Sequence, residues 1–338
     1  MKKIAAFSIL CLFVLSCNKS PVEVNSPTSI SGFDTAFITP NFGGLQSVYF
    51  LDERDGFVST YNGGLYKTTD SAKSWTALNS TTTLPILDIY FTDSQVGFAV
   101  GGLNFCGGTG CIPPGGFILK TTDGGKSWKN IFTPTDKVEI TSVYFVNASL
   151  GFCVGDNVVF KTTNGGQTWS EQKINNLGGK MMQIKFTISR NGFIVCLFGK
   201  ILVTADGGAT WQIKSPNGNI GYYAISEKDG SVFVCGQGKI IKSTNGGDSW
   251  IELSNSPVDI FAIHFTSRQT GFAFGRGNYS GGDWGYSFGS IYYTDDGGES
   301  WNGTGDIKEV GLIQDVSFPT SKLAYAISGN KIIRLTVK

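Results

Sequence analysis

The chain has 338 residues, of which 27 are Lys or Arg and 26 are Asp or Glu, so its formal net charge at pH 7 is +1. A nucleic-acid-binding protein concentrates basic charge on one face, and a balance this even argues against a nucleic-acid partner. Hydrophobic residues make up 41% of the chain, which is ample for a large core. Nothing in the composition indicates a second domain.

The N-terminus has the pattern of an export signal. Two lysines at positions 2 and 3 precede an apolar stretch, residues 4–15, that leads into Val14-Leu15-Ser16-Cys17. This stretch is shorter than the roughly 20 residues that span a bilayer as a helix, so we interpret residues 1–16 as a signal peptide. The last four residues resemble a bacterial lipobox. The resemblance implies cleavage before Cys17 and acylation of its thiol; an ordinary cleaved signal is the alternative.

Residues 18–32 are rich in Ser, Pro and Asn. Such a composition is typical of a flexible linker. We therefore interpret residues 17–32 as a tether that runs from a lipidated Cys17 to the folded part of the chain. This interpretation places the protein in the cell envelope, anchored to a membrane and facing the periplasm or the exterior. The sequence does not distinguish the inner from the outer membrane.

From residue 33 onward the chain is organised as a repeat. A variant of the phrase Ser/Thr-x-Asp-x-Gly-x-Ser/Thr-Trp occurs six times. We predict a compact turn in which the Asp or Asn side chain accepts hydrogen bonds from backbone NH groups, the glycines adopt positive φ, and the Trp packs inward. The acidic and tryptophan positions of the six copies are Asp70 and Trp75, Asp123 and Trp128, Asn164 and Trp169, Asp206 and Trp211, Asn245 and Trp250, and Asp296 and Trp301.

The spacing of the repeat predicts a β-propeller. Successive tryptophans of the phrase lie 53, 41, 42, 39 and 51 residues apart, and a period of about 40 to 45 residues is the length of a four-stranded blade. Short β-branched and aromatic runs separated by Gly, Asn and Asp recur in each period, as expected of strands joined by tight turns. Seven inner-strand runs occur, at Val48, Ile89, Val143, Ile184, Tyr223, Ile263 and Val316. We therefore predict an all-β fold with seven blades over residues 33–338.

The last repeat is incomplete. After residues 331–334 it contains neither a seventh copy of the turn phrase nor an outer strand. The stretch Phe33 to Thr39 is apolar enough to be a strand and precedes the first complete repeat. We predict that it supplies the missing outer strand and closes the ring. A closed ring leaves only short, protected strand edges.

The cysteines after the signal fall into two groups. Cys106 and Cys111 lie in a Gly-rich loop, and outside the cytoplasm a disulfide that closes this loop is the favoured interpretation. A metal site is the alternative, although the only histidine, His264, lies in an inner strand. The other three cysteines, Cys153, Cys196 and Cys235, fall in second-strand runs and are expected to be buried thiols.

Two long intervals contain most of the non-repetitive sequence: an insertion at about 103–116 in blade 2 and another at about 276–290 in blade 6. Both fall between the second and third strands, so they should leave the face opposite to the repeated turns and face each other across the channel mouth. Aromatic and Arg side chains of this kind anchor interfaces and stack on ligands. The candidate binding residues are Arg276, Tyr279, Asp283, Trp284, Tyr286 and Phe288. The alternative is that this loop buries its own aromatic side chains over the channel.

No catalytic set, metal site or cofactor motif is apparent. His264 occupies an inner-strand position held by Tyr49, Tyr90 and Tyr144 in other blades, so a packed strand residue is the favoured interpretation. The Gly-Gly pairs belong to turns and not to phosphate-binding loops. No spacing singles out a pair of acids such as glycoside cleavage requires.

The repeated phrase resembles the Asp-box or BNR repeat of sialidases, certain endoglucanases, sortilin-type receptors and photosystem II stability and assembly factors, over residues 33–338. Sialidases carry an Arg-Ile-Pro motif, and none of the arginines here is followed by Ile-Pro. The similarity is greatest to the assembly-factor family, which has a single propeller, an exported or lipidated N-terminus and repeats reading like Gly-x-Ile-x-Lys-Thr-Thr-Asp-Gly-Gly-x-x-Trp. This resemblance implies a non-enzymatic chaperone for membrane-complex assembly.

We therefore predict a monomeric, membrane-tethered binding or scaffold propeller that assists assembly or stability of an envelope protein or complex. Its binding face would be the one bearing the blade 2 and blade 6 insertions. The alternative is a carbohydrate-binding or glycoside-hydrolase-like propeller that uses Trp284 and Tyr286 as a stacking platform. The sequence does not identify the partner or the ligand.

Overall fold

A computed structural model describes residues 29–30, 33–38, 42–102, 106–107, 110–111, 115–187, 190–216, 218–280, 286–305, 307 and 310–337. The predicted signal peptide and most of the predicted tether lie outside the described residues. Within the described ranges, no helix is long and apolar enough to cross a membrane.

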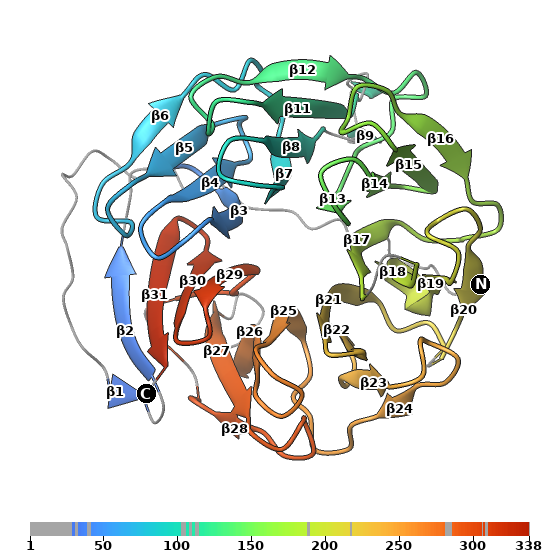
Figure 1. Ribbon diagram of the computed structural model, residues 1–338. Coiled ribbons are helices and arrows are strands. Elements are labelled where there is room, and N and C mark those ends of the chain that lie inside the picture. Colours follow the sequence, from blue (N-terminus) through green and yellow to red (C-terminus); the bar gives the residue numbers. More distant parts are fainter. Residues whose placement is uncertain are drawn as a thin grey trace.

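Seven antiparallel sheets are arranged in a ring around a central channel, which confirms the predicted seven-bladed β-propeller (Figure 1). From the channel outward, blade 1 contains β3 (Leu45–Phe50), β4 (Gly56–Thr60), β5 (Leu65–Thr68) and β6 (Thr76–Leu78), and blade 2 contains β7 (Ile86–Phe91), β8 (Gly97–Gly101), β11 (Phe117–Thr121) and β12 (Lys129–Phe132). Blade 3 contains β13 (Ser142–Phe145), β14 (Gly151–Gly155), β15 (Val158–Thr162) and β16 (Ser170–Lys173). Blade 4 contains β17 (Met181–Phe186), β18 (Gly192–Cys196), β19 (Ile201–Thr204) and β20 (Gln212–Lys214), with the short 3-10 helix η1 (Leu197–Gly199) between β18 and β19.

The remaining blades follow the same order. Blade 5 contains β21 (Tyr222–Lys228), β22 (Ser231–Gly236), β23 (Ile241–Ser243) and β24 (Ile251–Glu252), and blade 6 contains β25 (Ile260–Phe265), β26 (Gly271–Ser280), β27 (Tyr286–Thr294) and β28 (Asn302–Gly303). Blade 7 contains β29 (Asp315–Thr320), β30 (Leu323–Ser328), β31 (Lys331–Val337), β2 (Phe33–Ile38) and β1 (Ser29–Ile30). The blade 2 insertion contains the small hairpin β9 (Cys106–Gly107) and β10 (Gly110–Cys111).

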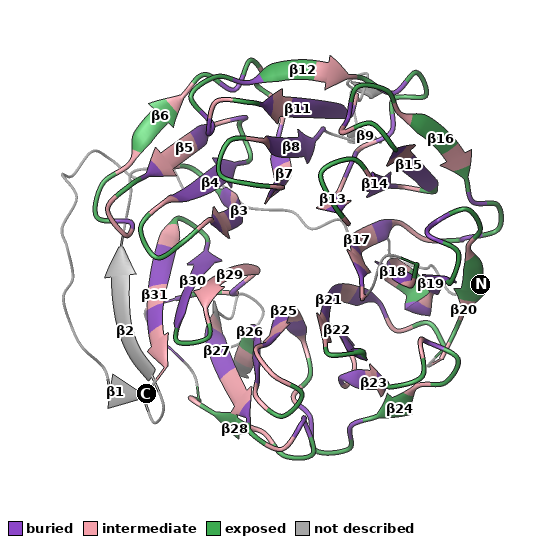
Figure 2. Cartoon of the chain, viewed as in Figure 1, coloured by how far each residue is buried: buried purple, intermediate pink, exposed green. Residues whose placement is uncertain are grey.

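The core lies between the blades and is built around their second strands. Every residue of β4, β8, β14 and β18 is buried, whereas the outermost strands of blades 1 to 6 are largely exposed (Figure 2). A phenylalanine of a second strand stacks on a phenylalanine of the next blade's inner strand, as Phe57 does on Phe91 with ring centroids 4.6 Å apart. Aromatic pairs of this kind contribute about 0.5–1.5 kcal/mol beyond the area that they bury. The repeated aromatic positions therefore hold neighbouring blades together.

The ring is closed by the N-terminal strand, as predicted. Strand β2 pairs with the C-terminal strand β31 over six residue pairs, from Phe33↔Val337 to Ile38↔Ile332. Strand β1 then pairs with β2, so that blade 7 has a fifth strand at its outer edge. The closing pairs join residues about 300 positions apart in the sequence. A contact of this separation requires both ends of the chain to be present and ordered before the ring is complete.

We expect a variant that lacks residues 1–39 to lose cooperative unfolding, because β31 would then present an unpaired edge. Thermal unfolding followed by circular dichroism should show a broad or low-temperature transition. The matched control is a variant that lacks only residues 1–28, which keeps β1 and β2 and should unfold like the parent chain. Equal transitions for the two variants would contradict the closing role of β2.

Candidate functional site

The repeated turns form one set of potential site residues, and their side chains are engaged within the turns. In blade 2, Asp123 Oδ1 accepts hydrogen bonds from Thr121 Oγ1 and Ser127 N, both within 2.9 Å, and Asp123 Oδ2 accepts one from Ser127 Oγ at 2.6 Å. These hydrogen bonds lower the pKa of Asp123 to about 2, the largest effect coming from the Ser127 hydroxyl. Trp128 is buried, and its ring meets Phe91 edge-on. The turn therefore stabilises the blade and leaves no carboxylate available for chemistry.

The other turns use the same hydrogen bonds with small changes. Asn164 and Asn245 occupy the acidic position in blades 3 and 5, and their amide groups donate to Thr168 and Ser249 where an aspartate would accept. In blade 1 the glycines are replaced by Ser71 and Ala72, which still adopt positive φ values of 63° and 67°. A non-glycine residue costs about 1–2 kcal/mol in this conformation.

Lysines of four third strands join the repeated turn of one blade to the blade before it. In four blades the lysine ammonium donates to a glycine carbonyl in the next blade's turn and also lies 5.2–5.5 Å from the centre of a second-strand phenylalanine ring. The four hydrogen bonds are Lys67 to Gly124 at 2.8 Å, Lys120 to Gly165 at 2.7 Å, Lys161 to Gly207 at 2.9 Å and Lys242 to Gly297 at 3.1 Å. Blade 4 has Val203 at this position, paired with Phe193. The contact is therefore missing between blades 4 and 5.

We expect Val203→Lys to raise the free energy of unfolding by up to about 1 kcal/mol, because its ammonium can lie over Phe193 and donate to the turn of blade 5. The lysine stem would keep most of the apolar contact of the valine. Chemical denaturation measures the change. The converse substitution, Lys161→Val, should lower stability by a similar amount. A lower stability of Val203→Lys would show that this position does not accept the lysine contact.

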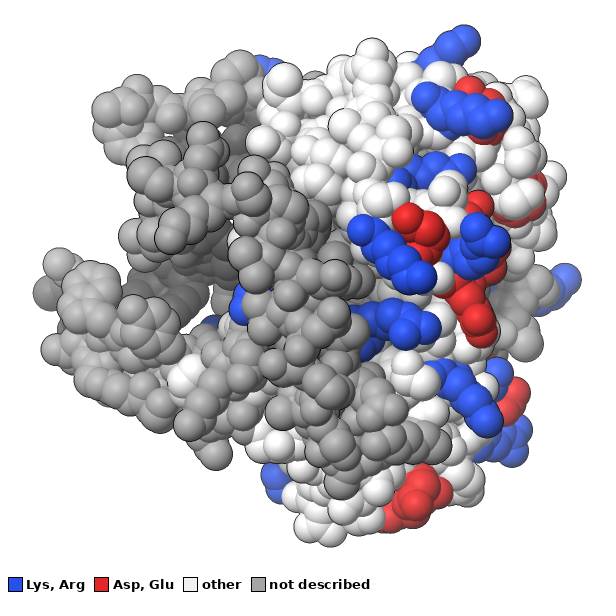
Figure 3. Space-filling view, turned by 90° about the vertical axis from the view of Figure 1, so that its left-hand side faces the viewer, with Lys and Arg blue, Asp and Glu red and all other residues white. Residues whose placement is uncertain are grey.

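Surface charge does not mark a site on the part of the surface that is coloured in Figure 3. In the side view of Figure 3, Lys and Arg side chains are intermingled with Asp and Glu side chains over the coloured part of the surface. Few of these charges form close pairs: the salt bridges recorded among the described residues are Lys173 to Asp136, Lys180 to Glu139 and Lys239 to Glu252. The candidate surfaces must therefore be sought in the connections between strands.

The two insertions leave the propeller at the end of the strands opposite to the repeated turns. The turns join third to fourth strands, whereas β9 and β10 lie between the second and third strands of blade 2. In blade 6 the insertion lengthens β26 and β27, which pair as far as Ser280↔Tyr286. We call this end of the molecule the insertion face. It also carries the connections from each outermost strand to the next blade.

The predicted binding residues of blade 6 are placed as follows. Arg276 is exposed, and its guanidinium carbon lies 6.0 Å from the centre of the Phe261 ring. Tyr279 and Tyr286 lie in the extended hairpin, opposite Ser287 and Ser280. Phe288 is partly buried. Asp283 and Trp284 lie outside the described residues.

Arg276 has aromatic neighbours that sequence reasoning did not single out. Phe261 stacks on Tyr223 of blade 5, with ring centroids 4.6 Å apart and planes 9° from parallel. Both residues occupy the irregular position at the start of an inner strand, where the pairing register shifts. This shared position, visible only once the strands are aligned, is the signal that could have identified the pair.

The described cysteines fall into two groups, one in the hairpin of the blade 2 insertion and one in buried second strands. Cys106 and Cys111 lie opposite each other in the β9–β10 hairpin. The disulfide between them stays a prediction. Cys153, Cys196 and Cys235 are buried and free, and burial raises the pKa of each thiol well above its ordinary value. The prediction that these three are buried thiols is confirmed.

Two carboxylates join inner strands across blade boundaries. Asp315 Oδ2 accepts hydrogen bonds from Val48 N and Ser47 Oγ of blade 1, at 2.9 and 3.0 Å. Asp88 makes the same two contacts to Val143 N and Ser142 Oγ of blade 3, both at 2.9 Å. The channel edge of each inner strand has no neighbouring strand, so these side chains satisfy backbone NH groups that would otherwise lack a partner in the protein.

Burial raises the pKa of these carboxyl groups, to about 7 for Asp88 and about 6 for Asp315, against the lowering effect of their hydrogen bonds. Lys185 of blade 4 lies near both groups, and burial lowers the pKa of its ammonium.

His264 stacks on Phe318 with ring centroids 4.3 Å apart, and burial lowers the pKa of His264 to about 3. His264 is therefore a packed, neutral residue, as predicted. No group of three or more His, Cys, Asp or Glu suited to a metal ion occurs among the residues that the structure describes.

The raised pKa of Asp88 predicts a pH dependence of stability. Between its ordinary value of 3.8 and about 7, the folded protein binds more protons at this group than the unfolded chain does, so stability falls as pH rises through this range. We expect Asp88→Asn to make the fall between pH 5 and pH 7 shallower in denaturation experiments. Asp123→Asn is the control, because the pKa of Asp123 is lowered and its effect lies at more acidic pH. Equal slopes for Asp88→Asn and the parent would contradict the assignment.

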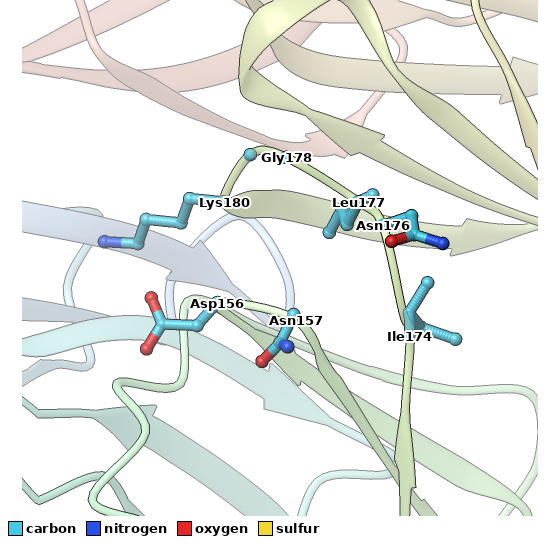
Figure 4. Close-up of a pocket in the computed structure, with 8 residues that line it drawn as sticks. Asp156, Asn157, Ile174, Asn176, Leu177, Gly178 and Lys180 are labelled. Atoms are coloured by element: carbon cyan, nitrogen blue, oxygen red, sulfur yellow. The ribbon is translucent and has the colours of Figure 1, made fainter.

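A pocket of about 310 Å³ opens between the β14–β15 turn and the connection from β16 to β17 (Figure 4). Asp156 and Asn157 line one side, and Ile174, Asn176 and Lys180 line the other. Lys180 is already engaged, since its ammonium lies 2.7 Å from Glu139 Oε2. The pocket is thus a recess on the insertion face with a mixed polar and apolar lining and without a set of convergent reactive groups.

The fold and the repeated turns define a single β-propeller without a recognisable catalytic set among its described side chains. The sequence profile described as "Photosynthesis system II assembly factor YCF48" matches two overlapping stretches, residues 72–213 and 176–330. The chain therefore belongs to this family.

One sequence relative agrees with this assignment. The chain is 24% identical over 306 residues to the photosystem II assembly lipoprotein Ycf48 of Synechococcus sp. (strain CC9902), covering 88% of this chain and 86% of the relative. Its fold is similar to that of a YCF48 structure described as bound to D1 peptide, with a TM-score of 0.68, 16% identity, and coverage of 90% and 97% of the two chains. It is also similar to the GH74 enzyme of Niastella koreensis, with a TM-score of 0.68 and 17% identity, covering 87% of this chain and 53% of the enzyme. At such identities the two structural similarities show the fold alone.

Proposed function

We propose that this protein is a non-enzymatic binding propeller that assists the assembly or stability of a membrane protein complex. Family membership over most of the propeller is the observation that carries the proposal. A relative that aligns with 88% of this chain is named an assembly lipoprotein, and a similar propeller is described as bound to a peptide of D1. The partner class proposed here is accordingly a segment of a membrane protein in the cell envelope.

The proposal includes attachment to a membrane. Residues 1–16 are the signal peptide, Cys17 is the lipidated residue and residues 18–32 are the tether. The name of the Synechococcus relative supports lipidation. The tether would include β1 and lead into β2 at the outer edge of blade 7, so the ring-closing strand would also connect the propeller to its anchor. A monomeric propeller with no cofactor is sufficient for this function.

The insertion face is the proposed docking side. The candidate residues that the structure describes, Arg276 and Phe288, lie in or beside the long hairpin of blade 6 together with Tyr279 and Tyr286. The repeated turns at the other end of the strands use their polar groups internally. The insertion face therefore offers the side chains that are available to a partner.

Affinity capture of the full-length, lipidated protein from its native membranes after mild crosslinking tests the proposal. We expect one stoichiometric membrane protein of the envelope, absent when residues 279–288 are deleted. Cys17→Ser is a matched control that keeps the propeller and removes the anchor; it should weaken capture without abolishing it in detergent. Recovery of no stoichiometric protein by the correctly folded parent would contradict the proposed function.

A carbohydrate-binding propeller is the second candidate, because the fold is similar to part of a GH74 enzyme. The aromatic residues of the blade 6 insertion would then stack on sugar rings. A glycan array with the purified propeller distinguishes the candidates, since only this one predicts glycan binding that depends on residues 279–288.

A further inference from the structure

Contacts on the insertion face join blades 4, 5 and 6 into one continuous strip beside the channel mouth. At the blade 4 end, the Phe198 ring lies over Gly179, where an added Cβ would be 3.1 Å from Phe198 Cδ2. Leu197 approaches Gly221, whose NH group donates to Gln237 Oε1 at 3.4 Å. The strip therefore begins on η1 and reaches the connection between blades 4 and 5.

The strip continues without a break to blade 6. Gln237 lies close to Tyr223, Tyr223 stacks on Phe261, and the Arg276 guanidinium carbon lies 6.0 Å from the centre of the Phe261 ring. The backbone NH group of Arg276 donates to Asp259 O at 3.1 Å, next to Val258. We call the surface from Phe198 through Tyr223 and Phe261 to Arg276 the aromatic strip.

Phe198 is the most unusual residue of the strip. Its φ and ψ angles are 62° and 34°, in the left-handed region that bulky side chains rarely occupy. Its side chain is 57% exposed, so burial does not compensate for this conformation. A strained backbone that holds a large apolar side chain in solvent is a recurrent feature of binding sites.

The opposite end of the strip is basic. Arg276 is exposed and forms no salt bridge with the residues that the structure describes, and its guanidinium carbon lies 6.0 Å from the centre of the Phe261 ring. A guanidinium in this position can accept a carboxylate in a two-pronged hydrogen bond. Val258, 50% exposed, adds apolar surface beside it. Isolated apolar and Arg anchors on a preformed surface are typical of peptide and protein interfaces.

We propose that the aromatic strip binds an extended peptide segment of the partner, with an apolar side chain against Phe198 and a carboxylate on Arg276. This inference rests on the proposed function and specifies where on the insertion face the partner docks and which side chains it must present. The strip spans three blades, so the segment has to be extended to contact both anchors.

The test uses a synthetic array of random 12-residue peptides probed with the purified full-length protein. We expect enrichment of peptides that contain an aromatic or aliphatic residue and, several positions away, Asp or Glu. Binding of the best peptide, measured by fluorescence anisotropy, should weaken at least about tenfold in Phe198→Ser and in Arg276→Gln, the loss typical of an interface anchor. Arg276→Lys should recover only part of this loss, because an ammonium lacks the paired donors of a guanidinium.

Tyr61→Ser is the matched control, because Tyr61 is an exposed aromatic residue, 39% accessible, in the corresponding second-to-third-strand turn of blade 1. It should leave peptide binding unchanged. Phe198→Gly is a further variant, since glycine adopts positive φ without strain. We expect it to raise the melting temperature while weakening peptide binding to the same extent as Phe198→Ser.

Absence of peptide enrichment, enrichment of peptides without acidic residues, or unchanged binding in Phe198→Ser and Arg276→Gln would overturn the inference. Membrane capture separates this failure from a failure of the proposed function. If the strip variants capture the same stoichiometric partner as the parent, the proposed function stands and the aromatic strip is not its docking surface. If the parent captures no partner and enriches no peptide, both proposals fail.

Discussion

Closure of the ring is the constraint on which the rest of the structure depends. Each blade packs its faces on two neighbours, and a seventh blade of only three strands would leave the edge of β31 without a partner. Strand β2 removes this exposed edge, and the Asp315 carboxylate joins the inner strands of the two blades that meet at the closure. In the proposed function, the same strand would also connect the propeller to its membrane anchor.

The lysine contact between a third strand and the next blade's turn recurs around the ring but does not occur at every blade boundary. Four lysines join a third strand to the next blade's turn, while Val203 leaves the boundary between blades 4 and 5 without this contact. The aromatic strip crosses the same boundary on the opposite face, and Phe198 adopts its strained conformation there.

The chemistry of the described side chains favours binding over catalysis. Aspartates of the repeated turns are held by neighbouring hydroxyl and NH groups, the channel carboxylates are occupied by backbone NH groups, and His264 is packed and neutral. These groups stabilise strands and turns. The residues left available to a partner are aromatic, apolar and basic groups on the insertion face, which are the side chains that anchor protein interfaces.

The sequence by itself determined the repeat, the number of blades and the origin of the closing strand. These features follow from local rules: the turn phrase has one stable geometry, strand-forming runs recur at the length of a blade, and a missing outer strand must be supplied by the apolar stretch at the other end of the chain. The sequence also indicated the buried state of Cys153 and the packed state of His264 from their positions in strands. Neither inference required knowledge of contacts between blades.

Only the tertiary structure decided which residues of different blades meet. Tyr223, Phe261 and Arg276 lie in three strands separated by connections of various lengths, and their stacking depends on the angle between blades 5 and 6. Phe198 looks like an ordinary core residue in the sequence, because its exposure follows from a left-handed backbone conformation that residue type does not predict. The raised pKa of Asp88 likewise arises from burial among neighbouring blades. Local patterns specify turns and strands, whereas a binding surface arises from the packing of segments distant in sequence.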